Sequence, residues 1–252
     1  MRRELSEKEI LDTVRDIRHE APGIGAYKLY LMLKELYPDG MRGRDWFYGL
    51  MHESHLMLKP EKRRHTTSSN HPYRKYKNMI KGLTVNRINQ LWVADITYID
   101  TDEGVAYLHL LTDAFTHEII GWVLSDSLVA SNTVTALEMG ISHVSPLGFD
   151  GLIHHSDRGV QYCCNQYIDR LQAIKATISM TEDYKPTDNA IAERVNGIIK
   201  QEWLYRMKRP PDVVVARDLL GRIIGFYNNR RPQRSNRDML PPVRFREALT
   251  CM

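Results

Sequence analysis

One strand-like segment limits what this chain can fold into. Residues 91–99, LWVADITYI, alternate as a β-strand does and are apolar on both faces except at Asp95. Asp95 shares its face with Val93 and Thr97, and Trp92 lies on the opposite face. A carboxylate inside an apolar strand is unfavourable unless its charge is compensated, and a divalent cation is a strong compensator. The alternative is a buried aspartate with an ordinary protein partner.

A second acid, Asp157, follows the apolar segment 152–156 at the point where a strand gives way to a loop. Open sheets place their ligands at strand ends. His154 and His155 stand beside it and could suggest zinc, but no second pair at metal-ligand spacing accompanies them. We therefore expect the two histidines to pack or to touch phosphate.

The third acid, Glu193, lies on a helix predicted over 189–204. A step of roughly 100° per residue places an apolar stripe about opposite Glu193; its members are Ile191, Val195 and Ile198. The residues that fall on the side of Glu193 are Asn189, Asn196, Gly197 and Lys200. A lone glutamate on such a face is ordinarily only solvated, so it is the two earlier acids that make Glu193 a candidate.

The rest of the chain from residue 90 onward predicts an α/β core. Strands are expected at 91–99, 105–112, 118–125, 152–156 and 175–180, and helices at 131–143, 165–173, 189–204 and 212–228. Three meandering strands followed by alternating helices and strands indicate a mixed sheet with helices packed on it.

The N-terminal part is expected to be helical, over 7–20, 26–36 and 44–55, with either Trp46 or Phe47 buried in the last helix. Short helices joined by a tight glycine-containing turn suggest a helix-turn-helix, whose last helix would enter a DNA major groove. Arg42 and Arg44 stand where base contacts would be made. A helical subdomain that only packs or dimerises is the alternative.

Charge is unevenly distributed along the chain. Residues 1–90 carry 18 Lys and Arg against 11 Asp and Glu, residues 91–182 carry 3 against 12, and residues 183–252 carry 14 against 8. An acidic centre between basic arms fits a metal-binding core with ends that grip a polyanion, although an unevenly charged solvated surface is the alternative. The basic segment 59–78, which includes Arg63 and Arg64, is predicted to be a linker that orders against phosphates or stays a solvated tether.

Composition excludes several classes of protein. With 252 residues, 42% of them hydrophobic and 26% charged, the chain is an ordinary globular sequence that can bury a substantial core. No apolar run approaches the roughly 20 residues of a membrane helix. The first residues lack a secretory apolar region, and 3 cysteines make no disulfide framework. A cytoplasmic location is the expectation.

Ordered motifs at these residues resemble a known family. They are Trp92–Ile99, His155–Tyr162, Asp188–Glu193 with Lys200 and Glu202 following, Tyr227–Ser235 with Pro241 and Pro242, and the helical segment from Gly25 to Tyr30. The chain resembles the second-reading-frame transposases of the IS-three group of bacterial insertion sequences, within the retroviral-integrase-like Asp-Asp-Glu superfamily. Residues 181–187 depart from the family by replacing an expected glycine-containing loop. A helix-turn-helix stands where retroviral integrases have a zinc module.

The resemblance implies a ribonuclease-H-like fold, with a mixed sheet flanked by helices, preceded by a small helical domain. It implies a DNA transposase in which Asp95, Asp157 and Glu193 hold two Mg²⁺ ions, with Mn²⁺ possible, for cleavage and strand transfer at terminal inverted repeats. The residues expected to contact DNA are Lys200, Asn189, Arg158, Lys28, Arg42, Arg44, Arg63, Arg64, Arg230 and Arg231.

The implied partners are the element's terminal inverted repeats, target DNA, further copies of the chain assembled on DNA and the first-reading-frame product, with no membrane, in the nucleoid-associated bacterial cytoplasm. The expected divisions are a helix-turn-helix-like domain at 1–58, a basic linker at 59–88, a catalytic core at 89–207, and a C-terminal helix with an arginine-rich tail at 208–252. Two other functions stay open: a nuclease of the same fold that cuts without joining, and a non-catalytic DNA-binding regulator.

Overall fold

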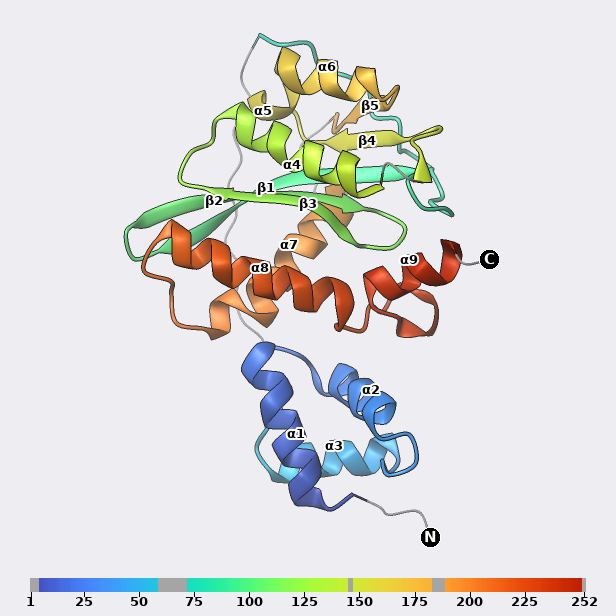
Figure 1. Ribbon diagram of the computed structural model, residues 1–252, viewed down its shortest axis with the longest axis vertical. Helices are drawn as coiled ribbons and strands as arrows, with labels where there is room; N and C mark the ends of the chain where they lie inside the picture. Colours follow the sequence, from blue (N-terminus) through green and yellow to red (C-terminus); the bar gives the residue numbers. More distant parts are fainter. Residues whose placement is uncertain (1–4, 59–71, 145–146, 183–188, 251–252) are drawn as a thin grey trace.

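A computed structural model describes residues 5–58, 72–144, 147–182 and 189–250. At its N-terminal end, helices α1 (Glu7–Glu20), α2 (Ala26–Leu36) and α3 (Arg44–Glu53) form one compact unit, drawn in blue in Figure 1. Ser6 and Glu9 form a capping box that fixes the start of α1. The three helices occur where the sequence predicts them, although α3 ends two residues earlier. Phe47 is fully buried and Trp46 only partly.

The described strands form one mixed sheet in the order β3-β2-β1-β4-β5. Strands β1 (Leu91–Thr101), β2 (Gly104–Asp113) and β3 (Ile119–Ser125) form an antiparallel meander. Strands β4 (Ile153–Ser156) and β5 (Thr177–Met180) continue the sheet parallel to β1. Strand β1 therefore lies at the centre, which explains why both of its faces are apolar.

Helices cover both faces of the sheet, as Figure 1 shows. Helices α4 (Ala130–Val144), α5 (Val160–Cys163) and α6 (Asn165–Ala173) pack with Trp92 and Ala94 on one face. Helices α7 (Ala190–Glu202) and α8 (Val213–Asn229) pack against the other face, and α9 (Pro242–Thr250) packs against α8. The predicted mixed sheet flanked by helices is confirmed.

Helix α4 approaches the sheet closely at Gly121 of β3. A Cβ added at this glycine would lie 2.1 Å from the carbonyl oxygen of Ala136 and 3.0 Å from the backbone nitrogen of Gly140. Only a residue without a side chain fits between strand and helix here. Gly121 thus sets the spacing of this layer.

Two described helices were not predicted. Helix α5 has 4 residues, which is too short to show a hydrophobic period. Helix α9 follows Pro241 and begins at Pro242, a pair that suggests a break in a helix. Proline is nevertheless well suited to the first position of a helix, because the amide hydrogen that it lacks would have no partner there. Residues 59–71 of the predicted linker lie outside the described residues.

The N-terminal unit joins the core through the end of α7. The Trp203 indole nitrogen donates to the carbonyl oxygen of Glu20 at 2.8 Å, and the Gly23 amide donates to that of Glu202 at 2.6 Å. The Glu202 carboxylate accepts from Lys28 at 2.6 Å and from Arg231 at 2.8 and 2.9 Å. The buried residues of the unit and of α7 and α8 belong to one hydrophobic cluster.

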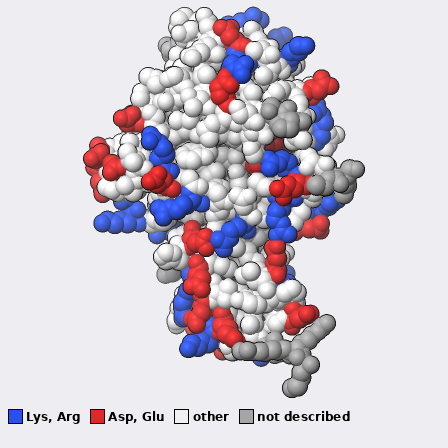
Figure 2. All heavy atoms as spheres, in the orientation of Figure 1, with Lys and Arg blue, Asp and Glu red and all other residues white. Residues whose placement is uncertain are grey.

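On the face drawn in Figure 2, basic and acidic side chains lie side by side over the N-terminal unit and the adjoining part of the core. The uneven charge along the sequence thus does not produce a region of a single sign on this face. In the described part of the chain, no helix has the length and apolar character needed to cross a bilayer.

Candidate active site

Asp95 lies in the middle of the central strand, on the face that α7 covers. Its Oδ2 atom accepts a 2.7 Å hydrogen bond from the side-chain nitrogen of Asn196. One residue earlier, the carbonyl oxygen of Ala94 accepts from the side-chain nitrogen of Asn189 at 3.1 Å. Helix α7 is thus tied to β1 at two points, one of them a carboxylate.

The electrostatics of Asp95 link it to the other two acids. Burial, the negative charge of Asp157 and, to a smaller extent, that of Glu193 together raise the pKa of Asp95 to about 7. The hydrogen bond from Asn196 acts in the opposite direction, because it stabilises the ionised form. The fold therefore brings the three acids into one electrostatic neighbourhood, although they are far apart in sequence.

Asp157 stands in the loop after β4, as the sequence indicates. Its Oδ1 atom accepts a 2.9 Å hydrogen bond from the Gly159 amide, which fixes the side chain at the start of α5. A Cβ at Gly159 would come within 3.0 Å of this oxygen and 3.3 Å of Gln161 Oε1. The glycine thus leaves room beside the carboxylate.

Glu193 lies in the first turn of α7 and is exposed, as predicted. The prediction for its neighbours is partly wrong. Asn196 was expected on the outward side with Glu193, but it is 5% exposed and contacts Asp95. The buried apolar residues of α7 are Ala192, Val195 and Ile199. Helix α7 packs against the sheet on one side and against other helices on another. Asn196 is therefore buried although it is polar, because it lies on a part of the helix that these neighbours cover.

The donor set suits a hard divalent cation, because carboxylate and amide oxygens are the ligands that such ions take. The side-chain oxygens of Asn189 and Asn196 could add to the three acids as ligands, because both oxygens are buried and have no hydrogen-bond partner in the described structure. Among the described residues, no three histidine, cysteine or acidic side chains are grouped closely enough to hold a metal as they stand. Coordination by all three acids therefore requires side chains to move, and Glu193 is the exposed one of the three.

The two histidines beside Asp157 are buried and serve the packing of the core. His154 Nε2 is bonded to the Tyr167 hydroxyl at 2.8 Å, and His155 Nδ1 to the Ser179 hydroxyl at 2.8 Å. Burial lowers the pKa of His154 to about 3, so that it is neutral near pH 7. The expectation that these histidines pack is confirmed.

Three of the residues expected to contact DNA lie around the acids. Lys200 is half-buried, and burial lowers its pKa while the negative charges of Asp95 and Asp100 act against that shift. Arg158 donates to the carbonyl oxygen of Glu182 at 2.8 Å. Asn189 is 7% exposed and bonds to β1. The negative charge of Asp95 thus reaches Lys200.

The other expected DNA contacts are spread over the molecule. Arg42 and Arg44 are exposed at the start of α3, with Arg42 over the ring of Trp46 at 4.6 Å and Arg44 bonded to Asp45. Arg230 is exposed and bonds to Glu20 at 2.5 Å.

Lys28 and Arg231 share Glu202, and Arg231 is 3% exposed. The Arg231 guanidinium is therefore engaged by Glu202 inside the protein and cannot reach a phosphate in this conformation. Arg63 and Arg64 lie outside the described residues, as do most of residues 181–187.

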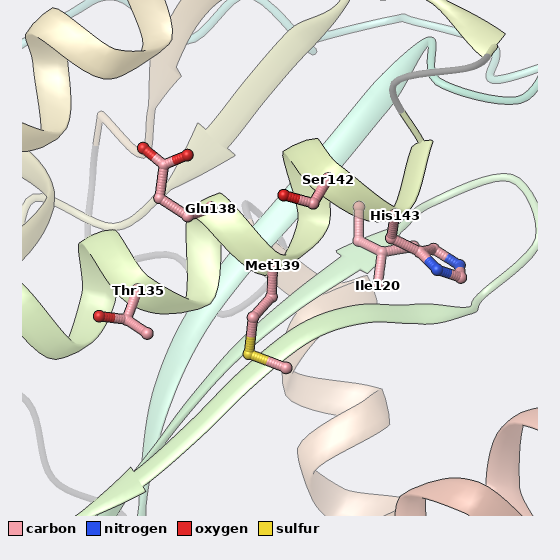
Figure 3. Close-up of a pocket in the computed structure, with 6 residues that line it drawn as sticks. All are labelled: Ile120, Thr135, Glu138, Met139, Ser142 and His143. Atoms are coloured by element: carbon pink, nitrogen blue, oxygen red, sulfur yellow. The ribbon is translucent and has the colours of Figure 1, made fainter.

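A shallow pocket on α4 and β3, drawn in Figure 3, is separate from this site. Its lining includes Glu138 and His143 but none of the three acids. Glu138 bonds to Arg170 at 2.9 Å, and His143 bonds to Glu118 at 2.8 Å. Both polar groups thus have structural partners, and the acids remain the candidate for chemistry.

Comparison with known proteins identifies the family of this chain. Two models of the integrase core domain match residues 85–186 and 174–242. The 31 kDa protein of insertion element IS600 from Shigella sonnei is 34% identical over 211 residues, which are 81% of this chain and 75% of the relative. The transposase for insertion sequence element IS904 from Lactococcus lactis is 30% identical over 237 residues, 89% of each chain.

Other similarities cover less. The chain spans 58% of the length of a Mycobacterium tuberculosis protein named for insertion sequence element IS986/IS6110, at 33% identity and over 64% of this chain. The magnesium complex of the HTLV-2 integrase catalytic core, in its trimeric form, aligns with a TM-score of 0.49 and 17% identity, over 63% of this chain and 96% of that one. The coverage and identity of the first two relatives decide the assignment. The chain belongs to the insertion-sequence transposases of the IS-three group, which carry an integrase core domain.

Proposed function

We propose that the protein cleaves and joins DNA at the terminal inverted repeats of its element, with Asp95, Asp157 and Glu193 as the ligands of divalent metal. The observation that carries this proposal is the position of Asp95 on the central strand, where Asn196 of α7 holds its carboxylate and the charges of Asp157 and Glu193 act on it and, with burial, raise its pKa to about 7. Neighbouring carboxylates repel one another because their charges have the same sign, and a cation bound between them removes that repulsion.

Mg²⁺ or Mn²⁺ ions held by Asp95, Asp157 and Glu193 would supply Lewis-acid activation of an attacking hydroxyl and stabilisation of the departing oxygen. The protein's own residues hold and orient the site. Asn196 fixes the Asp95 carboxylate through Oδ2, and the Gly159 amide fixes Asp157 through Oδ1. Glu193, exposed at the start of α7, would be the third ligand. No covalent protein intermediate is required.

DNA is positioned by cations near the acids and by the N-terminal unit. Lys200 shares the electrostatic neighbourhood of Asp95 and is suited to a phosphate next to the reacting one. Arg42 and Arg44 lie at the exposed N-terminal end of α3. In a helix-turn-helix, the N-terminal residues of the recognition helix are those that contact the bases. Since two DNA ends must meet, we infer that copies of the chain assemble on DNA. The first-reading-frame product remains a proposed further partner.

The test uses labelled DNA from the ends of the protein's own element, incubated with Mg²⁺ or with chelator. Asp95→Asn and Glu193→Gln should bind the DNA but neither cut nor join it. Asp102→Asn, an exposed acid at the tip of the same β-hairpin, is the matched control and should retain activity. Full cleavage by Asp95→Asn in Mg²⁺ would refute the assignment.

The same substrates separate the two other functions. A pre-cut end that is never joined to target DNA, although intact ends are cut, would indicate a nuclease. Binding without any cleavage and without metal binding that depends on Asp95 would indicate a regulator.

A further inference from the structure

Tyr162 is a buried residue of α5, five positions after Asp157. Its side chain is 2% exposed, and its ring packs edge-on against Tyr167 with the ring centres 5.5 Å apart. In the described part of the chain its buried hydroxyl has no hydrogen-bond partner. The hydroxyl of Tyr167, by contrast, bonds to His154 at 2.8 Å. Buried polar groups without a partner are uncommon and often belong to functional sites.

The surroundings of Tyr162 connect it to the acids. A Cβ built on Gly159 would lie 3.0 Å from Asp157 Oδ1 and 3.7 Å from Tyr162 Cδ2, so the carboxylate and the ring edge border the same small space. After burial, the negative charges of Asp95 and Asp157 are the next causes that raise the pKa of the Tyr162 phenol. The phenol therefore stays protonated and is a hydrogen-bond donor within electrostatic reach of both carboxylates.

We propose that the Tyr162 hydroxyl is a positioning donor for the acidic site, which hydrogen-bonds to an oxygen of the Asp95–Asp157 pair when that pair holds a divalent cation. The inference rests on the proposed function. A carboxylate that gives one oxygen to a cation keeps lone pairs that need a donor, and such a donor fixes its direction. Asn196 supplies one for Asp95 Oδ2. Tyr162, which packs on the α5 side of the sheet, would supply another to the pair.

The test is Tyr162→Phe, which keeps the ring and removes only the hydroxyl. Calorimetric titration of the full chain with Mn²⁺ should show an affinity about 10- to 100-fold weaker than that of the wild type, the range for residues that orient metal ligands. Without metal, the melting temperature should be unchanged or higher, because a buried hydroxyl without a partner has been removed.

Tyr167→Phe is the matched control, since it removes a neighbouring buried hydroxyl that does have a partner. This variant should melt at a lower temperature and bind Mn²⁺ as the wild type does. Equal Mn²⁺ affinity of Tyr162→Phe and the wild type would overturn the inference while leaving the proposed function intact. A melting temperature that falls in Tyr162→Phe as it does in Tyr167→Phe would overturn it too. If wild-type Mn²⁺ binding does not depend on Asp95, the proposed function itself fails.

Discussion

The buried carboxylate of Asp95 makes the stability of the protein depend on pH in a defined direction. Its pKa is about 7 in the folded protein and 3.8 in the reference state. Between these values the folded chain keeps a proton that the unfolded chain has lost. The free energy of unfolding therefore falls as pH rises from about 4 to about 7. Asp95→Asn removes this dependence, because the amide resembles the protonated acid and still offers an oxygen to Asn196.

The size of the effect follows from the shift. A difference of about 3 pKa units at about 1.4 kcal/mol each gives an upper limit of about 4 kcal/mol. Water reaches part of the Asp95 side chain and screens its charge, so we expect about 2–4 kcal/mol. Asp95→Asn should match the wild type at pH 4 and be more stable by this amount at pH 8.

The assay is urea unfolding of both proteins in chelator at pH 4, 6 and 8. Other groups that titrate cancel in the difference between the two proteins. A difference that does not change with pH, or that shrinks as pH rises, would refute the reasoning. Adding Mg²⁺ at pH 8 should then stabilise the wild type and leave Asp95→Asn unchanged, because only the wild type keeps the ligand.

Four further changes test other contacts. Asn196→Ala removes the donor to Asp95, so the pKa of Asp95 rises further, and cleavage should slow about 10-fold with its pH profile moved upward. Lys200→Ala should weaken DNA binding at every sequence and reduce the slope of log K against log salt by about 1, measured by fluorescence anisotropy. Glu202→Gln leaves Lys28 and Arg231 without a charge partner and should cost about 3 kcal/mol in urea unfolding, whereas intact stability would contradict the role of the pair. Gly121→Ala places a Cβ against α4 and should cost about 3 kcal/mol, whereas Gly225→Ala on the open face of α8 should not destabilise.

The sequence predicts the layers of this fold well because their signals are local. Alternation in 91–99 identifies β1 and correctly separates the face of Val93 and Asp95 from that of Trp92. Helices α1 and α2 begin and end where the apolar period does. Each of these elements carries its own pattern of burial, so no knowledge of its partners is needed.

Partners are what the sequence does not predict. The period of α7 indicates which side of the helix is apolar, but it does not reveal that Asn196 turns to Asp95, 101 positions away. Likewise, no local pattern connects Tyr167 to His154, or distinguishes the satisfied hydroxyl of Tyr167 from the unsatisfied one of Tyr162. Hydrogen bonds between buried polar groups depend on distances that only the packed structure fixes.

Helix α7 connects the two ends of the proposed function. Its first turns carry the exposed Glu193 and Asn196, which bonds to Asp95 of the sheet, and its last residue, Glu202, holds Lys28 of the N-terminal unit. A helix of 13 residues is about 20 Å long and stiff. The distance between the N-terminal unit, where DNA recognition is proposed, and the acidic site is therefore set by this one stiff helix. A rotation of the N-terminal unit on binding DNA would move α7, and with it the glutamate proposed as the third ligand.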